Sequence, residues 1–193
     1  GFPAVATSNV AIANGALQRL GAKRIESLTQ DHPNARSMNA AFERVRKRLL
    51  RRYDWGFAIS RASVAADADG PTWGGWNRYS LPNDYVRLIR DDESGINLDW
   101  KIEGRYILTA DAAPLEFRYI ADITDPAQFD DSFIEAFECK LALETCEEIT
   151  QSTSKKASIQ ADYDDAIAEG KKAGAIEKSA REFPEDEWIQ ARL

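Results

Sequence analysis

The chain has 193 residues, of which 44% are hydrophobic and 30% are charged, and its formal net charge at pH 7 is −7. This length suits one sizeable domain with one core and is short for two. No stretch approaches the ~20 apolar residues of a membrane-spanning helix, so neither a membrane span nor a membrane partner is expected.

Charge is distributed unevenly between the two halves. Residues 1–100 contain 14 Lys and Arg against 11 Asp and Glu, whereas residues 101–193 contain 11 against 21. The first half is therefore basic and the second strongly acidic, and the two halves could attract each other within a subunit or between subunits.

The first predicted helix covers residues 8–20, where Ser8 or Asn9 can cap its start and Gly21 is placed to end it. Its apolar residues recur at helical spacing and define one face, at Ile12, Ala13, Ala16, Leu17 and Leu20. No basic region precedes the small apolar residues of the N-terminal stretch, so no secretory signal is expected.

A second helix is predicted over residues 34–53. Its buried face follows from apolar residues three or four positions apart, namely Met38, Phe42, Val45, Leu49 and Tyr53. The rest of its surface is expected to be basic, with Arg44, Arg46, Lys47, Arg48, Arg51 and Arg52. Three interpretations of this basic stretch are open: a solvated face paired within the subunit, an interface between subunits, or contact with nucleic acid.

Residues 55–121 form short β-branched or aromatic runs separated by turn residues, which predicts one small, mainly antiparallel sheet. Strands are expected in GFAISRASV, YVRLIR, LDWKI, RYILTA and LEFRYIA. The dipeptide Glu103-Gly104 suits a two-residue hairpin turn, which would place Trp100 opposite Ile107.

The segment 66–82, between the first two predicted strands, is too rich in Gly and Pro for regular structure. It carries two tryptophans, Trp73 and Trp76. Either they form a recognition tip, since tryptophan is enriched at binding hot spots, or they fold back over the sheet.

Two more helices are predicted over residues 131–150 and 153–173, the first of them a central core helix with two apolar stripes. The fold class is therefore α+β, a bundle of about four helices with the β-domain inserted between the second and third. Residues 1–176 form this single domain. Residues 177–193 lack long periodicity but contain three large apolar side chains, which predicts an extended docking arm.

Little in the sequence indicates chemistry. Cys139 and Cys146 lie seven positions apart on one predicted helix, about 10 Å along its axis, so they are expected as reduced core thiols. His32 is the one histidine and there is no CxxC, so no metal and no cofactor are expected. There is no GxSxG, P-loop or GxGxxG motif, and no carboxylate pair stands out, so the chain is not expected to be an enzyme.

Five stretches are informative as a set. They are IANGALQRLGAKRIESL (12–28), FERVRKRLLRRYDWGFA (42–58), YSLPNDYVRLI (79–89), WKIEGRYILTADAAPLEFRYIADITDPAQFDDSFIEAFECKLA (100–142) and PEDEWIQARL (184–193). In this order they resemble the head-to-tail adaptor family of tailed bacteriophages, known in short-tailed phages as tail tubular protein A. The loop of residues 65–76 does not match.

The resemblance implies a structural virion protein of the head–tail junction, assembled in the host cytoplasm and without enzymatic activity. Twelve copies would form a ring under the portal protein, extend the DNA channel and provide a platform for a downstream tail protein, a nozzle or tail tube. Packaged DNA would pass without sequence-specific binding, because a ring of twelve would carry a charge of about −84, which repels phosphate.

Ring closure needs a heterologous interface, in which one patch meets a different patch on the next copy. We hypothesise that basic residues of the second helix pair with acidic residues of the last two helices, some of them across subunits. The subunit-interface residues are Arg44, Arg48, Arg51, Arg52, Asp162, Asp165 and Glu169. Phe183, Trp188 and Ile189 would dock on the portal or a neighbour, and Trp73 and Trp76 would contact the distal tail.

Two alternatives remain open. The first is a DNA-binding accessory protein that uses residues 44–52, which would show a steep salt dependence. The second is a tail-borne cell-wall hydrolase, which needs a carboxylate pair in a cleft with one raised pKa.

Overall fold

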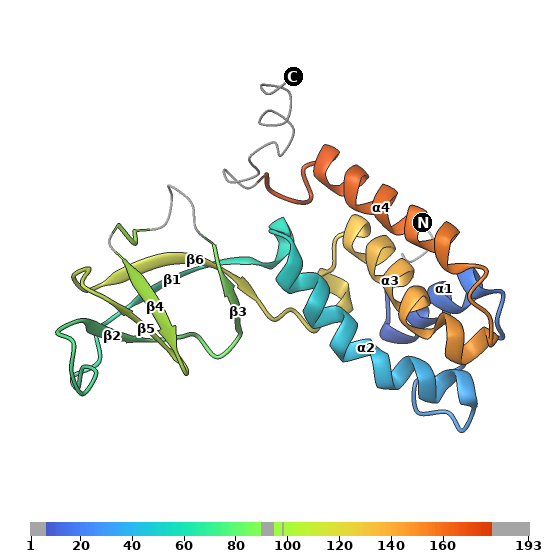
Figure 1. Cartoon of the computed structure of the whole chain (residues 1–193), viewed down its shortest axis with the longest axis horizontal. Coiled ribbons are helices and arrows are strands. Elements are labelled where there is room, and N and C mark those ends of the chain that lie inside the picture. Colours follow the sequence, from blue (N-terminus) through green and yellow to red (C-terminus); the bar gives the residue numbers. More distant parts are fainter. Residues whose placement is uncertain (1–6, 90–94, 98, 179–193) are drawn as a thin grey trace, which may run out of the picture.

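The computed structural model describes residues 7–89, 95–97 and 99–178. This part of the chain contains four α-helices and two three-stranded antiparallel sheets, with all the strands between the second and third helices. The α+β prediction is therefore confirmed. The helices gather at one end of the molecule and the sheets at the other, and α2 runs from the bundle to their boundary (Figure 1).

The first two helices begin and end close to the predicted residues. Helix α1 spans Asn9–Leu20, the Ala11 amide donates to Ser8 Oγ at 3.2 Å, and Gly21 ends the helix with a φ of +66°. Helix α2 spans Pro33–Arg52. Its N-cap is His32, whose Nδ1 accepts from the Asn34 amide at 3.1 Å, so the histidine has a structural role that the sequence did not predict.

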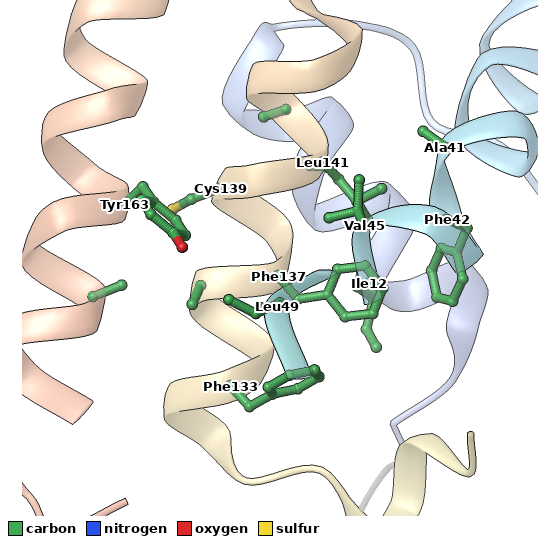
Figure 2. Close-up of a cluster of buried hydrophobic side chains, with 14 of the residues drawn as sticks. Ile12, Ala41, Phe42, Val45, Leu49, Phe133, Phe137, Cys139, Leu141 and Tyr163 are labelled. Carbon is green, nitrogen blue, oxygen red and sulfur yellow. The ribbon is translucent and has the colours of Figure 1, made fainter. Parts of the chain in front are cut away.

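Helix α3, Asp131–Thr150, is the centre of the bundle, and α1, α2 and α4 all pack on it. Figure 2 shows side chains of the four helices directed into one core, among them Phe42, Leu49, Phe133 and Tyr163. The apolar face predicted for α2 is buried from Met38 to Leu49. Both cysteines are free and buried, as predicted.

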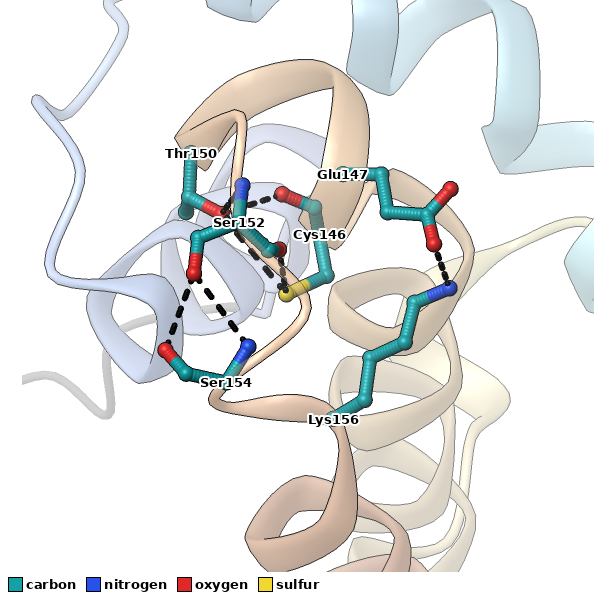
Figure 3. A network of polar contacts seen from close by, with 6 residues as sticks. All are labelled: Cys146, Glu147, Thr150, Ser152, Ser154 and Lys156. Atoms are coloured by element: carbon teal, nitrogen blue, oxygen red, sulfur yellow. Dashed lines mark hydrogen bonds and ion pairs between the residues drawn. The ribbon is translucent and has the colours of Figure 1, made fainter.

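Helix α4, Lys156–Lys172, begins three residues later than predicted. The reason is a polar turn that ends α3: Gln151 takes a left-handed conformation, and Ser152 and Thr150 satisfy groups of the turn (Figure 3). In the same network Lys156 Nζ lies 2.6 Å from Glu147 Oε1, which joins the first turn of α4 to the end of α3.

The β-domain contains two sheets, where the sequence predicted one. The first has the order β1-β6-β3, with β1 at Ile59–Val64, β6 at Leu115–Ala121 and β3 at Tyr85–Leu88. The second has the order β2-β5-β4, with β2 at Asn77–Ser80, β5 at Tyr106–Thr109 and β4 at Trp100–Glu103. Strand β2 lies in the stretch predicted to be irregular, because its four residues acquire their pairing from the distant β5.

The predicted β4–β5 hairpin is present, but its register differs by two residues. Gly104 and Arg105 form the turn, Gly104 has a φ of +60°, and Trp100 pairs with Thr109 instead of Ile107. A turn with glycine first and φ > 0 matches the type II′ position, which the shifted register supplies. A two-residue shift leaves every side chain on its predicted face.

The two sheets share a second core, separate from that of the bundle. Tyr79 and Ile107 of one sheet meet Phe117 and Tyr119 of the other there. Because side chains alternate along a strand, the next residue of β6, Ile120, faces the opposite way and joins the helical core. Strand β6 thus contributes to both cores and connects the two ends of the molecule.

The aromatic residues after α2 also lie at this connection. Trp55 is fully buried, donates from Nε1 to the Leu49 carbonyl at 2.9 Å, and packs edge-on against Phe133 with ring centroids 5.1 Å apart. Phe57, in the short 3₁₀ turn Gly56–Ala58, packs edge-to-face against Phe129 and Phe133. These rings hold the first strand of the β-domain against the bundle.

Candidate functional site

The exposed side of α2 is a strongly basic surface, which we call the basic face. Its members are Arg44, Lys47, Arg48, Arg51 and Arg52. One carboxylate of α3 lies against it: Glu144 accepts from Arg44 at 3.5 Å and from Arg48 at 3.4 Å. Since one carboxylate serves two guanidinium groups, the basic face keeps a net positive charge in an acidic protein.

Helix α4 presents the opposite charge on its exposed side, which we call the acidic face. Its members are Asp162, Asp164, Asp165 and Glu169. Helices α2 and α4 each pack on α3 and lie on opposite sides of it (Figure 1). One flank of the bundle is therefore basic and the other acidic.

Three of the predicted interface residues form ion pairs within the chain. Arg44 and Arg48 have an acidic partner on α3, one of the two helices expected to supply it, and this partner belongs to the same chain. Asp162 lies 3.9 Å from Arg19 of α1. In the residues that the structure describes, the basic face forms no ion pair with the acidic face, since α2 and α4 pack on opposite sides of α3 and come together at their C-terminal ends.

Arg46 is buried, although the sequence predicted it on the basic surface of the helix. Its side chain is 1% exposed and donates to Asp122, to Glu43 Oε2 at 2.6 Å and to the Ile123 carbonyl at 2.8 Å. Burial lowers the pKa of Arg46, but its hydrogen bonds and charge interactions with the two carboxylates outweigh this and raise it. Helical spacing could have predicted this burial, because Arg46 lies four residues after Phe42 and three before Leu49, on the inward face.

Two more arginines bind the β-domain to the ends of the helices. Arg87 of β3 donates to Asp54 and, through Nε, to the Arg51 carbonyl at 2.9 Å. Arg118 of β6 is buried and donates to Glu177 at 2.6 Å. The Glu177 amide also donates to the Asp54 carbonyl at 2.9 Å. The folded part therefore extends through Glu177, one residue into the predicted arm.

The two tryptophans of the distal loop differ in their surroundings. Trp73 is 86% exposed, whereas Trp76 is half-buried and lies under Lys101, whose Nζ is 5.0 Å from the ring centroid. Both line a cavity of about 520 Å³ beside Tyr106 of β5. Trp76 thus folds back over the sheet while Trp73 extends into solvent.

The three apolar residues predicted to dock on a partner, Phe183, Trp188 and Ile189, lie outside the described residues.

One carboxylate in the bundle has unusual surroundings. Burial raises the pKa of Glu138, an effect that Arg19 opposes and Glu135 reinforces. Glu138 lines a pocket of about 500 Å³ between α1 and α3 beside Arg19 and Arg24, and it is the one carboxylate in the described lining. A glycosidase site needs two carboxyl groups across the bond that it cleaves, so this pocket does not supply the pair.

The described residues contain no group of three or more His, Cys, Asp or Glu placed to hold a metal ion. In the same portion of the chain, none of the helices has the length and apolarity required to span a bilayer. Compared with protein-family models and with curated proteins, the chain gives no match.

Proposed function

We propose that the chain is a structural subunit of a phage tail, a head-to-tail adaptor that forms a ring with its own copies under the portal. The observation that carries the proposal is the opposite charge on the two flanks of the bundle, the basic face of α2 and the acidic face of α4. A head-to-tail contact between copies would join these two faces, and repeating it around an axis would close a ring. The resemblance of the sequence to the adaptor family supports the same function.

The shape of the chain is consistent with an adaptor that has two different neighbours. The bundle and the β-domain lie at opposite ends (Figure 1) and have separate cores, so each offers its own surface. In the proposed arrangement the bundle contacts neighbouring subunits and the portal, and the β-domain faces the downstream tail protein. Trp73, which is exposed in the loop between β1 and β2, is the proposed contact there.

Ring formation can be tested with charge reversal on the full-length chain. We expect Arg51→Glu/Arg52→Glu to abolish the oligomer that the wild type forms, alone or with purified portal, in light scattering and electron microscopy. A second variant, with Asp165→Arg/Glu169→Arg added, should restore it, because the attraction is then reversed on both faces. The matched control, Lys23→Glu/Arg36→Glu, changes the net charge equally on exposed residues outside the basic face and should assemble normally.

Salt provides an independent check, since exposed ion pairs weaken as the Debye length shortens. The wild-type oligomer should dissociate on going from ~0.1 M to ~1 M salt. Assembly of the Arg51→Glu/Arg52→Glu variant at the wild-type level, at low and high salt, would reject this interface.

DNA binding is the second candidate, because the basic face carries five exposed cations, of which Arg44 and Arg48 share one carboxylate, Glu144. If all five contact phosphates of a duplex, log Kobs should fall with log salt with a slope of about −4.5. Filter binding of the pure chain with duplex DNA measures this slope. A slope near zero, together with salt-sensitive rings, would favour the adaptor over the DNA-binding protein.

A further inference from the structure

A pocket of about 320 Å³ lies where the C-terminal ends of α2 and α4 meet β3 and the last described residues. Its charged lining comprises four cations, Arg52, Arg87, Lys171 and Lys178, and two carboxylates, Asp54 and Glu177. The pocket is therefore positive before any pairing is considered, at the end of the helix that carries the basic face.

Both carboxylates of the pocket are already bound by arginines. Asp54 accepts from Arg87, and Glu177 accepts from Arg118 at 2.6 Å. These pairs fasten the β-domain to the bundle, and Arg52, Lys171 and Lys178 line the same pocket. An anion that entered would not need to displace the two carboxylates.

Two of these cations converge on one aromatic ring. The Arg52 guanidinium lies 5.2 Å from the centroid of the Tyr53 ring, and Lys171 Nζ lies 5.8 Å from the same centroid. Cation–π attraction holds both side chains there in spite of their like charge. An added carboxylate beside the ring would be attracted by both, as in charge-assisted hydrogen bonding.

The chain itself carries an acidic segment that can reach the pocket. Lys178 lines the pocket and is the last residue described, and residues 179–193 follow it. The stretch EFPEDE at 182–187 contains four carboxylates in six residues. Glu185 is seven residues beyond Lys178, a span of up to about 24 Å when extended, which exceeds the size of the pocket.

Covalent attachment decides which copy supplies the segment. A short flexible tether holds a segment near its site at an effective concentration of the order of millimolar, whereas a second copy in a dilute solution is present at micromolar concentrations. We propose that residues 182–187 dock on this pocket of their own chain, with carboxylates directed at Arg52 and Lys171. This is a different contact from that of the apolar side chains of Phe183, Trp188 and Ile189, which are proposed to bind the portal or a neighbour.

Docking has a consequence for assembly, and this consequence rests on the proposed function. Arg52 belongs to both the pocket and the basic face, so the docked segment competes with the acidic face of the next subunit. The segment would hold the free chain back from self-association until it is released.

Carbodiimide crosslinking of the isolated full-length chain tests the contact, because it joins a lysine amine to a carboxylate that touches it. Equal amounts of ¹⁴N and ¹⁵N protein are mixed first, so that mass spectrometry separates links within a chain from links between chains. We expect Lys171 to be linked to the 182–187 peptide in pairs of one isotope only. The pair Lys156–Glu147, at 2.6 Å in the structure, is the internal reference.

The variant Arg52→Glu should lower the yield of the Lys171 link about fivefold relative to the reference, and Arg36→Glu should leave it unchanged. A reference link without a Lys171 link would overturn the proposal. Links made mainly of mixed isotopes would overturn it too, because the occupant would then be a second copy. The measurement needs no portal and no ring, so a negative result on this contact can be told apart from a failure of the proposed adaptor function.

Discussion

Replacing Arg46 by Met tests whether the buried arginine holds the β-domain to the bundle. Its side chain is 1% exposed, whereas Asp122 and Glu43, its carboxylate partners, are 27% and 63% exposed. Glu43 regains water when the arginine is removed, so its lost hydrogen bond costs little. Asp122 and the Ile123 carbonyl lose their donor in a shielded place, and a hydrogen bond to a charged group contributes about 1.5–3 kcal/mol.

The expected loss is therefore about 2–4 kcal/mol of unfolding free energy, allowing for the partial burial of Asp122 and for the apolar contacts that Met keeps. Urea unfolding followed by circular dichroism measures it. The matched control is Arg48→Met on the same helix, which removes a guanidinium that is 60% exposed and should cost less than about 0.5 kcal/mol. If the two variants unfold within about 1 kcal/mol of each other, the clamp assigned to Arg46 is wrong.

Three further predictions concern the bundle. Asn14→Ala should lower the free energy of unfolding in urea by about 2–3 kcal/mol, because the Asn14 side chain binds the amide and the carbonyl of buried Ile25, at 2.8 and 2.9 Å, and both groups would lose their partner. A loss below ~1 kcal/mol would contradict this. Because the pKa of Glu138 is raised in the folded state, the unfolding free energy of the wild type should fall as the pH rises from about 4.3, the unfolded pKa, through the folded pKa. Glu138→Gln should remove this fall, so the variant must gain more unfolding free energy over the wild type at pH 7 than at pH 4.5. Burial raises the pKa of Cys139 to about 11, so a thiol reagent at pH 8 should modify the native protein only as fast as it unfolds, and rapid native labelling would refute the burial.

The helices show how much of the fold could be predicted from local patterns. Ser8, Gly21 and Asp130 lie at helix ends because their side chains or backbone conformations satisfy the groups that a helix leaves unpaired. Apolar residues three or four positions apart marked the buried faces of the first three helices. These signals act within a few residues, so they can be read without knowing what packs on them.

The strands were predictable in part. Short β-branched or aromatic runs between turn residues identified β1, β3, β4, β5 and β6, but β2 and the division into two sheets depend on pairing between residues far apart in the chain. The hairpin register differed because the sequence offers two turns around Gly104, and the choice between them depends on tertiary contacts such as the pairing of Ile107 with Tyr79 of β2. Register is set by the partner strand, which a single run does not contain.

The candidate site divides in the same way. The sequence alone determined that positive charge gathers on the second helix and negative charge on the last two, because charge and helical spacing are local properties. Only the tertiary structure decided that α2 and α4 pack on opposite sides of α3, that Arg46 is buried, and that Arg52 and Lys171 meet over Tyr53. Each of these three features depends on contacts between residues far apart in the sequence, and such contacts are determined by the packing of the whole chain.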